Sequence, residues 1–367
     1  MVEPYGPAVE RRIMEMRAEY RDLLQNDRRW SLRTLFSTAD YDIADYCAGF
    51  RPNRYGTIAC AEVESFCRRH GIWLTAGGAQ YNSMTPYLHP AAITADRMTT
   101  IGIVNAILFW LNDTVGREKF PHLTSAAKTA ARRMVLRLGE TLETGCTTID
   151  STPEVHATAE LRARLTHDAD HTWLDRFTCS TIAHLSTAIR DQNARARGGV
   201  PTVTEYIGIR THVSGMYPAI ALCEFARDDY LRWNLIRAAG LGAGLDHLRE
   251  LTVQIGALMN DVFSFEKECI VDRADFNLVA IFLLNNPGWT LADAIHGAAE
   301  LVCHLLTDFR RTHARLILEC DRHRGEPARA VRAHADDLVG CAQATWVWQT
   351  TTSRYRGNSI FIENTGR

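Results

Sequence analysis

Residues 251–268 constrain the fold more than any other stretch, because they are apolar on nearly every side of a helix. A helix that is apolar all round is buried in the protein. One narrow face differs: each helical residue advances by about 100°, which places Asn260, Ser264 and Glu268 side by side, with Lys267 next to them. The stretch therefore predicts a buried helix whose one polar face lines a cavity. Its apolar residues are Leu251, Ile255, Leu258, Met259, Val262, Phe263 and Phe265.

The polar face carries groups that suit a magnesium ion. An amide, a hydroxyl and a carboxylate supply the hard oxygen ligands that Mg²⁺ prefers, and Mg²⁺ keeps positions open for waters and substrate phosphates. Lys267 lies where it would contact such phosphates. The alternative is a solvated polar face of an amphipathic helix. The apolar surroundings argue against it, because polar side chains are rarely buried without a partner.

Helical patterns dominate the rest of the 367 residues, and alternating β-branched runs bounded by hairpin turns are missing. We therefore expect an all-α fold. No repeat, low-complexity tract or linker divides the chain, so residues 1–367 are interpreted as one domain, with roughly 15 N-terminal and 10 C-terminal residues flexible. The expected helices span 8–25, 60–70, 94–112, 123–144, 154–166, 170–196, 203–213, 216–237, 243–269, 291–321 and 326–353.

Charge and composition exclude several classes of protein. A formal net charge of −2 gives no reason to expect a nucleic-acid partner. No segment reaches about 18 uninterrupted apolar residues, and the N-terminus lacks a signal-peptide pattern, so we expect no membrane span. The ten cysteines show no paired Cys-x-x-Cys spacing, which argues against zinc and against a disulfide scaffold. We interpret them as reduced thiols of a cytoplasmic protein.

The expected helix 94–112 closes on a carboxylate, Asp113, after an apolar run. An acid at a helix C-terminus is disfavoured by the helix macrodipole, so Asp113 suggests that a cation compensates its charge. Phe109 lies four residues earlier on the same face of the helix. Its ring would adjoin a metal site at this helix end.

Two further segments carry arginines. In residues 200–215 a short helix contains Arg210, and Ser214-Gly215 is expected to break or bend it. Taken alone, Arg210 is better explained as an ordinary surface arginine near a helix end. Near the C-terminus Arg354 and Tyr355 follow an aromatic helix, and together they offer a planar bidentate donor and a hydroxyl for phosphate.

The stretch from Asn260 to Glu268 resembles the Asn-Asp-x-x-Ser-x-x-x-Glu metal motif of class I terpene synthases, including the lysine that commonly precedes its glutamate. This resemblance implies that Asn260, Ser264 and Glu268 are metal ligands. It also implies that Lys267 contacts the diphosphate.

The end of the 94–112 helix is similar to the aspartate-rich motif of the same family, with a departure from the usual pattern. If Asp113 takes the first position, Glu118 supplies the last acid and Thr114 replaces the second aspartate. If Asn112 takes it, Gly116 stands where the final acid belongs. We prefer the first alignment, which keeps both outer carboxylates and makes Asp113 and Glu118 the metal ligands.

The resemblance gives roles to the arginine segments as well. It implies that Arg210 senses the diphosphate and that Ser214-Gly215 forms the helix break that couples substrate binding to ionisation. It also implies that Arg354 and Tyr355 hydrogen-bond the diphosphate. Trp346, on the preceding helix, is either a wall of the substrate cavity or a tryptophan of the core.

Over roughly residues 80–356, the resemblance implies a class I terpene synthase-like α-helical bundle or barrel around a central apolar cavity. It implies a class I terpene cyclase, a carbon-oxygen lyase that uses three Mg²⁺ ions to ionise a linear prenyl diphosphate, farnesyl or geranylgeranyl diphosphate, and release diphosphate. The product would be a cyclic hydrocarbon or alcohol, formed while aromatic faces such as Phe109 and Trp346 stabilise the carbocation. A homodimer is left open.

Two alternatives remain at this point. A chain-elongating prenyl diphosphate synthase would use the same substrate class and metal, but that family has aspartate-rich motifs on both metal helices. A non-catalytic isoprenoid-binding protein is the other alternative, although binding a hydrocarbon tail requires no metal ligands. The Asn260, Ser264 and Glu268 pattern favours cyclisation over both.

Overall fold

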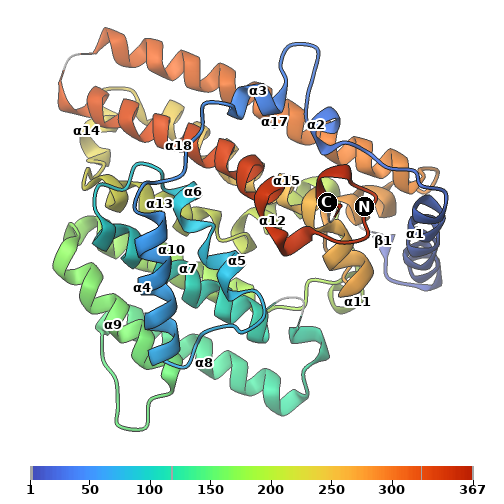
Figure 1. Ribbon diagram of the computed structural model, residues 1–367, viewed down its shortest axis with the longest axis horizontal. Helices are drawn as coiled ribbons and strands as arrows, with labels where there is room; N and C mark the ends of the chain where they lie inside the picture. Colours follow the sequence, from blue (N-terminus) through green and yellow to red (C-terminus); the bar gives the residue numbers. More distant parts are fainter. Residues whose placement is uncertain (1–2, 117–118, 324, 366–367) are drawn as a thin grey trace.

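The computed structural model describes residues 3–116, 119–323 and 325–365. Within these residues the protein is almost entirely helical, as the sequence predicts (Figure 1). The α-helices are α1 Pro7–Gln25, α2 Leu32–Leu35, α3 Ile43–Cys47, α4 Gly56–Arg69, α5 Gly78–Asn82, α6 Thr85–Leu88, α7 Ala95–Val115, α8 Ser125–Thr144, α9 Pro153–Asp168, α10 His171–Ala188, α11 Ala194–Arg197, α12 Val203–Val213, α13 Met216–Arg227, α14 Trp233–Ala238, α15 Gly242–Phe265, α16 Leu278–Asn285, α17 Leu291–Arg322 and α18 Glu326–Thr351. The other elements are the 3-10 helices η1 Phe120–His122, η3 Ser353–Tyr355 and η4 Ile362–Asn364, the π-helix η2 Glu266–Val271 and the short antiparallel pair β1 Glu3–Pro4 and β2 Gly199–Val200.

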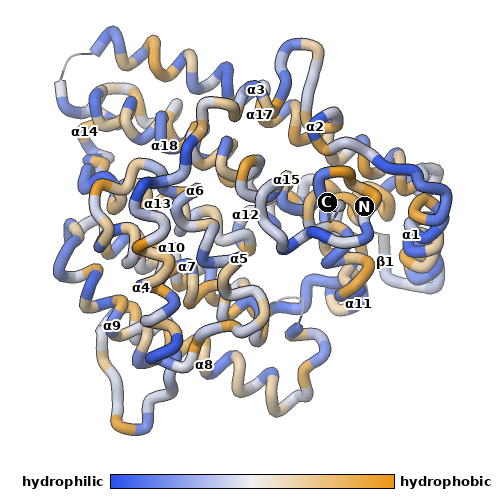
Figure 2. Tube along the Cα trace, viewed as in Figure 1, coloured by the Kyte–Doolittle hydropathy of each residue, from blue (hydrophilic) through white to orange (hydrophobic). Residues whose placement is uncertain are grey.

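Helix α15 forms the centre of the bundle and packs against α12, α13, α17 and α18. Its seven predicted apolar residues are buried, each at most 4% exposed. Gly256 lets α13 approach closely, because a Cβ at this position would lie 2.6 Å from Cε of Met216. The outer helices alternate hydrophilic and hydrophobic turns, as Figure 2 shows along α17. The central helix is therefore enclosed by amphipathic helices, which is the environment that its sequence requires.

Several expected helix boundaries agree closely with the structure. The expected helices 8–25, 203–213 and 291–321 match α1, α12 and α17 to within one residue at each end. The expected helix 216–237 is instead interrupted after Arg227, because Asp228 takes a left-handed conformation (φ 57°) and ends α13. The expected helix 170–196 ends early, at Ala188.

Helix α16 was not expected from the sequence. Its residues, Leu278–Asn285, are apolar on all sides except at the final asparagine, so the run gives no periodic signal that separates a helix from a strand. The visible signal is the cap, since the side chain of Asn277 accepts a hydrogen bond from Val279 N at 3.0 Å.

The described segments near both ends of the chain pack against the bundle. Helix α1 buries Val9, Ile13 and Met16, because it is amphipathic. At the other end Ile360 and Phe361 are fully buried. The carboxylate of Glu266 binds this segment by accepting hydrogen bonds from the backbone N of Ile360 at 2.8 Å and from Ser359 Oγ at 2.5 Å. Figure 1 marks both ends on the same side of the molecule.

Helix α7 is a core helix of the bundle. The stretch Ala95–His122 is long and apolar enough to cross a membrane by length and composition alone, but 56% of its most apolar window is buried inside the protein. It packs against α4, α5 and α9. Such a helix is weak evidence for a membrane span, because buried core helices have the same composition.

Candidate functional site

A cavity of about 180 Å³ opens at the C-terminal ends of α7 and α18 and beside the break between α12 and α13. Its wall combines polar and charged side chains with a set of apolar and aromatic ones. The polar or charged lining residues are Asn105, Asn112, His184, Arg210, Ser214, Asn260, Glu268, Thr345, Gln349, Arg354 and Tyr355. The apolar and aromatic lining includes Met84, Leu88, Leu108, Phe109, Met216, Ala219 and Trp348.

A second, larger cleft of about 850 Å³ lies between α10, α13, α14 and α15. Two ion pairs join its lining residues: Arg176 Nη2 lies 3.0 Å from Glu224 Oε2, and Arg232 Nε lies 3.6 Å from Glu326 Oε1. None of the predicted site residues that the structure describes lines it. The smaller cavity is therefore the candidate active site, because the predicted residues converge there.

Helix α15 and the π-helix η2 that continues it bring two of the three predicted metal ligands to the cavity wall, Asn260 and Glu268. The third, Ser264, is 2% exposed, and its Oγ makes no hydrogen bond within the described part of the chain. A buried hydroxyl without a partner is costly unless another group binds it. Glu268 is oriented by Asn277, whose Nδ2 donates to Glu268 Oε2 at 3.0 Å. These three oxygens fit a hard divalent cation.

The described residues contain no cluster of three or more His, Cys, Asp or Glu side chains arranged for a metal ion. The donor set predicted from the sequence does not need one, because two of its members on α15 are an amide and a hydroxyl. Oxygen donors of this kind suit Mg²⁺ rather than zinc.

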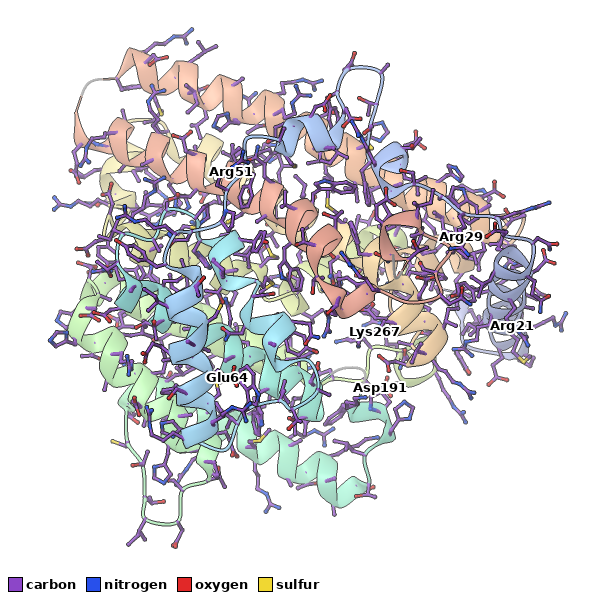
Figure 3. All side chains as sticks on the ribbon, in the orientation of Figure 1. Arg21, Arg29, Arg51, Glu64, Asp191 and Lys267 are labelled. Atoms are coloured by element: carbon purple, nitrogen blue, oxygen red, sulfur yellow. The ribbon has the colours of Figure 1, made fainter. Side chains whose placement is uncertain are left out.

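Lys267 is not among the residues that line the cavity. Residues after Phe265 continue as the π-helix η2, whose wider i→i+5 turn changes the angular position of each side chain. The 100° spacing that placed Lys267 beside Asn260 therefore does not apply to it. Lys267, which is labelled in Figure 3, instead pairs through its Nζ with Asp272 Oδ2 at 2.9 Å.

The second metal segment ends α7 as expected. The phenol of Tyr81 donates a hydrogen bond to Asp113 Oδ2, and Asn112 Nδ2 donates to Asp113 Oδ1 at 3.0 Å. Asn112 and Phe109 line the cavity, while Thr114 is exposed. Asp113 thus lies at the rim, one residue beyond the lining. Glu118 lies outside the described residues.

Arg210 is buried at the cavity wall, and it is not the surface arginine that its sequence position alone would suggest. Its Nε donates to Asp261 Oδ1 at 2.7 Å, and its Nη2 donates to Asn260 Oδ1 at 3.1 Å. Asp261 also accepts from the phenol of Tyr206 and from the backbone N of Leu278. The two neighbouring residues of the metal motif therefore hold one guanidinium.

The predicted helix break is confirmed at Ser214 and Gly215. Gly215 has φ 77°, a left-handed conformation that glycine adopts without strain. Ser214 Oγ donates to the carbonyl of Thr211 at 2.8 Å and accepts from the backbone N of Met216 at 3.1 Å. Both residues of the break line the cavity.

Arg354 and Tyr355 close the cavity from the C-terminal side in η3. The guanidinium of Arg354 lies 4.3 Å from the ring centre of Tyr81. Burial acts to lower the pKa of Arg354, but the neighbouring Tyr355 and Tyr81 outweigh it, so this pKa is raised above its usual value. The phenol of Tyr355 accepts a hydrogen bond from Asn260 Nδ2 at 2.9 Å. The C-terminal segment is thus linked directly to the metal helix.

Trp346 belongs to the core and does not line the cavity. Its ring lies edge-on to Phe36 and Phe263, with ring centres 6.1 and 5.8 Å away. Trp348, two residues later, lines the cavity, and its Nε1 donates to Ser83 Oγ at 3.1 Å. The helical rotation of about 200° between these positions explains why only one of them faces the cavity.

Sequence reasoning missed four residues of the site: Asp261, Tyr81, Gln349 and Trp348. Asp261 carried a visible signal, since a carboxylate between buried apolar residues requires a partner. Tyr81 gave none, because its contacts with Asp113, with Arg354 and with Phe109, whose ring it stacks on at 4.3 Å, depend on tertiary packing.

Comparison with known proteins agrees with this geometry. The chain matches the sequence model described as terpene synthase family 2, C-terminal metal binding, over residues 104–308, which is more than half of the chain. It is 24% identical over 221 residues to pristinol synthase of Streptomyces pristinaespiralis, covering 60% of this chain and 58% of that protein. It is 29% identical over 187 residues to (2Z,6E)-hedycaryol synthase of Kitasatospora setae, covering 50% and 53%. The matches thus span little more than half of each relative's length.

Solved structures show the same fold. The linalool/nerolidol synthase of Streptomyces clavuligerus, solved in complex with 2-fluorogeranyl diphosphate, has a TM-score of 0.68 at 21% identity, over 82% of this chain and all of that one. An α-eudesmol synthase has a TM-score of 0.68 at 19% identity, over 82% and 96%. The all-α fold is therefore that of class I terpene synthases. The chain belongs to the metal-binding terpene synthase family 2.

Proposed function

We propose that this protein is a class I terpene cyclase that ionises a linear prenyl diphosphate with Mg²⁺, cyclises the carbocation and releases diphosphate. One observation carries the proposal. A single cavity combines oxygen donors and two arginines, Arg210 and Arg354, with an apolar and aromatic interior. This division fits an amphiphile with an anionic head and a hydrocarbon tail.

The metal ligands that we propose are Asn260, Ser264 and Glu268 on one side and Asp113 on the other, with Glu118 as a further candidate. The unpartnered Oγ of Ser264 and the cavity-facing oxygens of Asn260 and Glu268 support this assignment. Three Mg²⁺ ions are the number implied by the family resemblance. When bound, they supply Lewis-acid stabilisation of the departing diphosphate.

The residues of the chain bind and orient the diphosphate. Arg210 and Arg354 place planar donors at the mouth, where their hydrogen bonds strengthen as negative charge develops on the leaving group. Asp261 accepts from the Nε of Arg210 and Asn260 accepts from its Nη2, so the guanidinium is fixed at the cavity wall where the diphosphate would bind. Tyr355 and the helix break at Ser214 and Gly215 line the same cavity wall, next to the place where the diphosphate would bind.

The interior protects and shapes the cation. Trp348 and Phe109 present aromatic faces, which attract a cation through the ring quadrupole. The apolar wall excludes water during ionisation. Lys267 is outside this wall in the present conformation, paired with Asp272, so we assign the diphosphate grip to Arg210, Arg354 and Tyr355.

Farnesyl diphosphate is the substrate we favour over geranylgeranyl diphosphate. A relative that is 25% identical over 208 residues is named as cyclising (2E,6E)-farnesyl diphosphate, and several other relatives are named as sesquiterpene or eudesmol-type synthases. We further propose that the chain acts as one domain in the cytoplasm. All ten cysteines, each within the described residues, are free thiols, which agrees with a reducing compartment.

The test is incubation of the purified protein with C10, C15, C20 and C25 prenyl diphosphates and Mg²⁺. A cyclic, hexane-extractable product from at least one substrate is expected. Absence of product from all four would sink the proposal. Longer linear diphosphates formed after addition of isopentenyl diphosphate would identify a chain-elongating synthase instead, and binding without diphosphate release would identify a binding protein.

A further inference from the structure

Asn105 is a polar residue in the hydrocarbon part of the cavity, where none is needed to bind diphosphate. It lies on α7 on the same face as Phe109 and Asn112, four and seven residues before them. At about 1.5 Å per helical residue, it is roughly 10 Å below the metal-binding end. The lining side chains at this depth on α6 and α7 and in the turn before α6 are Leu88, Leu108 and Met84. Asn105 therefore faces the tail of a substrate and not its head.

The side-chain amide of Asn105 makes a hydrogen bond through its nitrogen but none through its oxygen within the described part of the chain. Its Nδ2 donates to Thr85 Oγ1 at 3.0 Å, in a contact that is buried on both sides. Its Oδ1 accepts no hydrogen bond from the described part of the chain. Unlike Ser264 Oγ, it is not one of the fully buried polar atoms without a partner, so it is accessible from the cavity. This oxygen thus faces the cavity. If the side-chain amide of Asn105 were rotated by 180°, its Nδ2 would take the place of Oδ1, and a polar atom would still face the cavity.

A free amide atom in an apolar wall costs free energy unless it binds something small and polar. Water is the ligand that fits, since it donates to an amide oxygen and is small enough for one position in a cavity of about 180 Å³. A neutral amide is also a poor base, so it orients a water molecule without itself taking a proton from the carbocation.

We propose that Asn105 holds the water molecule that ends the cyclisation, so that the enzyme releases a terpene alcohol; this inference rests on the proposed cyclase function. The water oxygen forms a C–O bond with the cationic carbon. The resulting oxonium ion loses one proton, and the diphosphate released on ionisation is the base that receives it. The balance is prenyl diphosphate plus water giving terpene alcohol plus diphosphate. Without this water, the cation loses a proton from carbon and gives a hydrocarbon.

The experiment uses the full-length protein with Mg²⁺ and farnesyl or geranylgeranyl diphosphate in H₂¹⁸O, with boiled protein as the blank. Products are analysed by gas chromatography and mass spectrometry, and released diphosphate is measured in parallel. The wild-type protein should give a main product that is an alcohol carrying ¹⁸O. Asn105→Leu, which keeps the shape and removes the polarity, should lower the alcohol share by about tenfold, the effect of one lost hydrogen bond, and give hydrocarbon instead.

Leu108→Met is the matched control, because it changes the shape of the same helix face without changing its polarity. Leu108→Met should alter the ratio of product isomers and leave the share of alcohol among the products as it is in the wild type. Asn105→Ala serves as a second variant if the leucine variant does not fold.

A wild-type product that is a hydrocarbon, or an unchanged alcohol share in both Asn105 variants, would overturn the inference while leaving the cyclase function intact. Absence of diphosphate release from every substrate would contradict the cyclase function itself, and the inference with it. The diphosphate measurement therefore separates the two failures.

Discussion

Arg210 Nε donates to Asp261 Oδ1 at 2.7 Å, and both side chains are withdrawn from solvent, at 5% and 0% exposed. Asp261 follows Asn260 in the motif, and its carboxylate also contacts α12 and α16, where it accepts from Tyr206 and from the backbone N of Leu278. The two adjacent residues thus serve two purposes. Asn260 offers its amide to the cavity, and Asp261 fixes the arginine that we assign to the diphosphate.

Asp261→Asn should weaken both catalysis and stability. The substitution keeps the shape but leaves Arg210 as a buried charge, and breaking a buried ion pair costs about 3–5 kcal/mol of unfolding free energy. A misplaced donor at the leaving group should lower kcat by about 100-fold. Diphosphate release and thermal unfolding measure the two effects. Asp308→Asn, in the exposed pair with Arg311, is the control and should change stability by less than about 1 kcal/mol. An unchanged kcat in the Asp261 variant would remove Arg210 from the mechanism.

Glu268→Gln should raise the Mg²⁺ concentration needed for half-maximal rate while the helical circular dichroism stays the same. The amide can still contact Asn277 but lacks the charge that binds the cation. Even outer partners of metal ligands contribute about 10–100-fold to affinity or activity, so a ligand should contribute at least as much. Glu300→Gln, exposed on α17, should behave as the wild type. A Glu268 variant with normal Mg²⁺ dependence would contradict the assignment.

Substitution of the two tryptophans of α18 should affect different properties: Trp346 should matter for stability and Trp348 for the product pattern. Trp346→Phe leaves a space against Phe36 and Phe263 and should cost about 1–2 kcal/mol of stability, part of the 3–5 kcal/mol of a full truncation to alanine. Its product pattern should remain. Trp348→Phe changes the cavity wall and should alter the product pattern. Product chromatograms and thermal melts of both variants measure these effects. If only Trp346→Phe changed the product pattern, Trp346 rather than Trp348 would line the cavity.

Asp275 should contribute a loss of stability as the pH rises from about 4 to about 6. Burial raises the pKa of Asp275 from 3.8 to about 6, so between these values the folded state binds more protons than the unfolded state. A shift of two pKa units corresponds to about 3 kcal/mol of unfolding free energy. This contribution is fully lost at pH values above the pKa of the folded state. Asp337, also raised to about 6 by burial, acts in the same direction.

Asp275→Asn tests this pH dependence. The variant should match the wild type near pH 4 and show a smaller loss of unfolding free energy by pH 7.5, with the remaining loss due to Asp337. Chemical denaturation at both pH values measures it. Equal pH slopes in variant and wild type would show that Asp275 does not titrate as its burial requires.

The long helices and the metal face of α15 were predictable, because a helix that is apolar all round requires burial and its few polar residues then require a cavity. Asn260 and Glu268 line that cavity. Lys267 was not predictable, since its position depends on a π-turn that the 100° spacing ignores. Trp346 and Trp348 could not be told apart either, because both are buried near this end of α18 and the sequence does not show which one faces the cavity.

The aspartate-rich end of α7 was predicted only in part. Asp113 carried the signal of an acid at a helix C-terminus. Its partner Tyr81 lies 32 residues earlier, on a five-residue helix without a periodic pattern. Contacts of this kind arise when separate elements meet in the folded chain, and local sequence does not encode them.

The most direct measurement offers farnesyl and geranylgeranyl diphosphate side by side to the purified protein, with Mg²⁺ and with the metal removed by a chelator, and records diphosphate release and the product chromatogram. The account predicts a cyclic product and an equal amount of diphosphate from one of the two substrates, abolished by chelation and restored by added Mg²⁺. Turnover that persists without a divalent metal, or no turnover of either substrate, would contradict it.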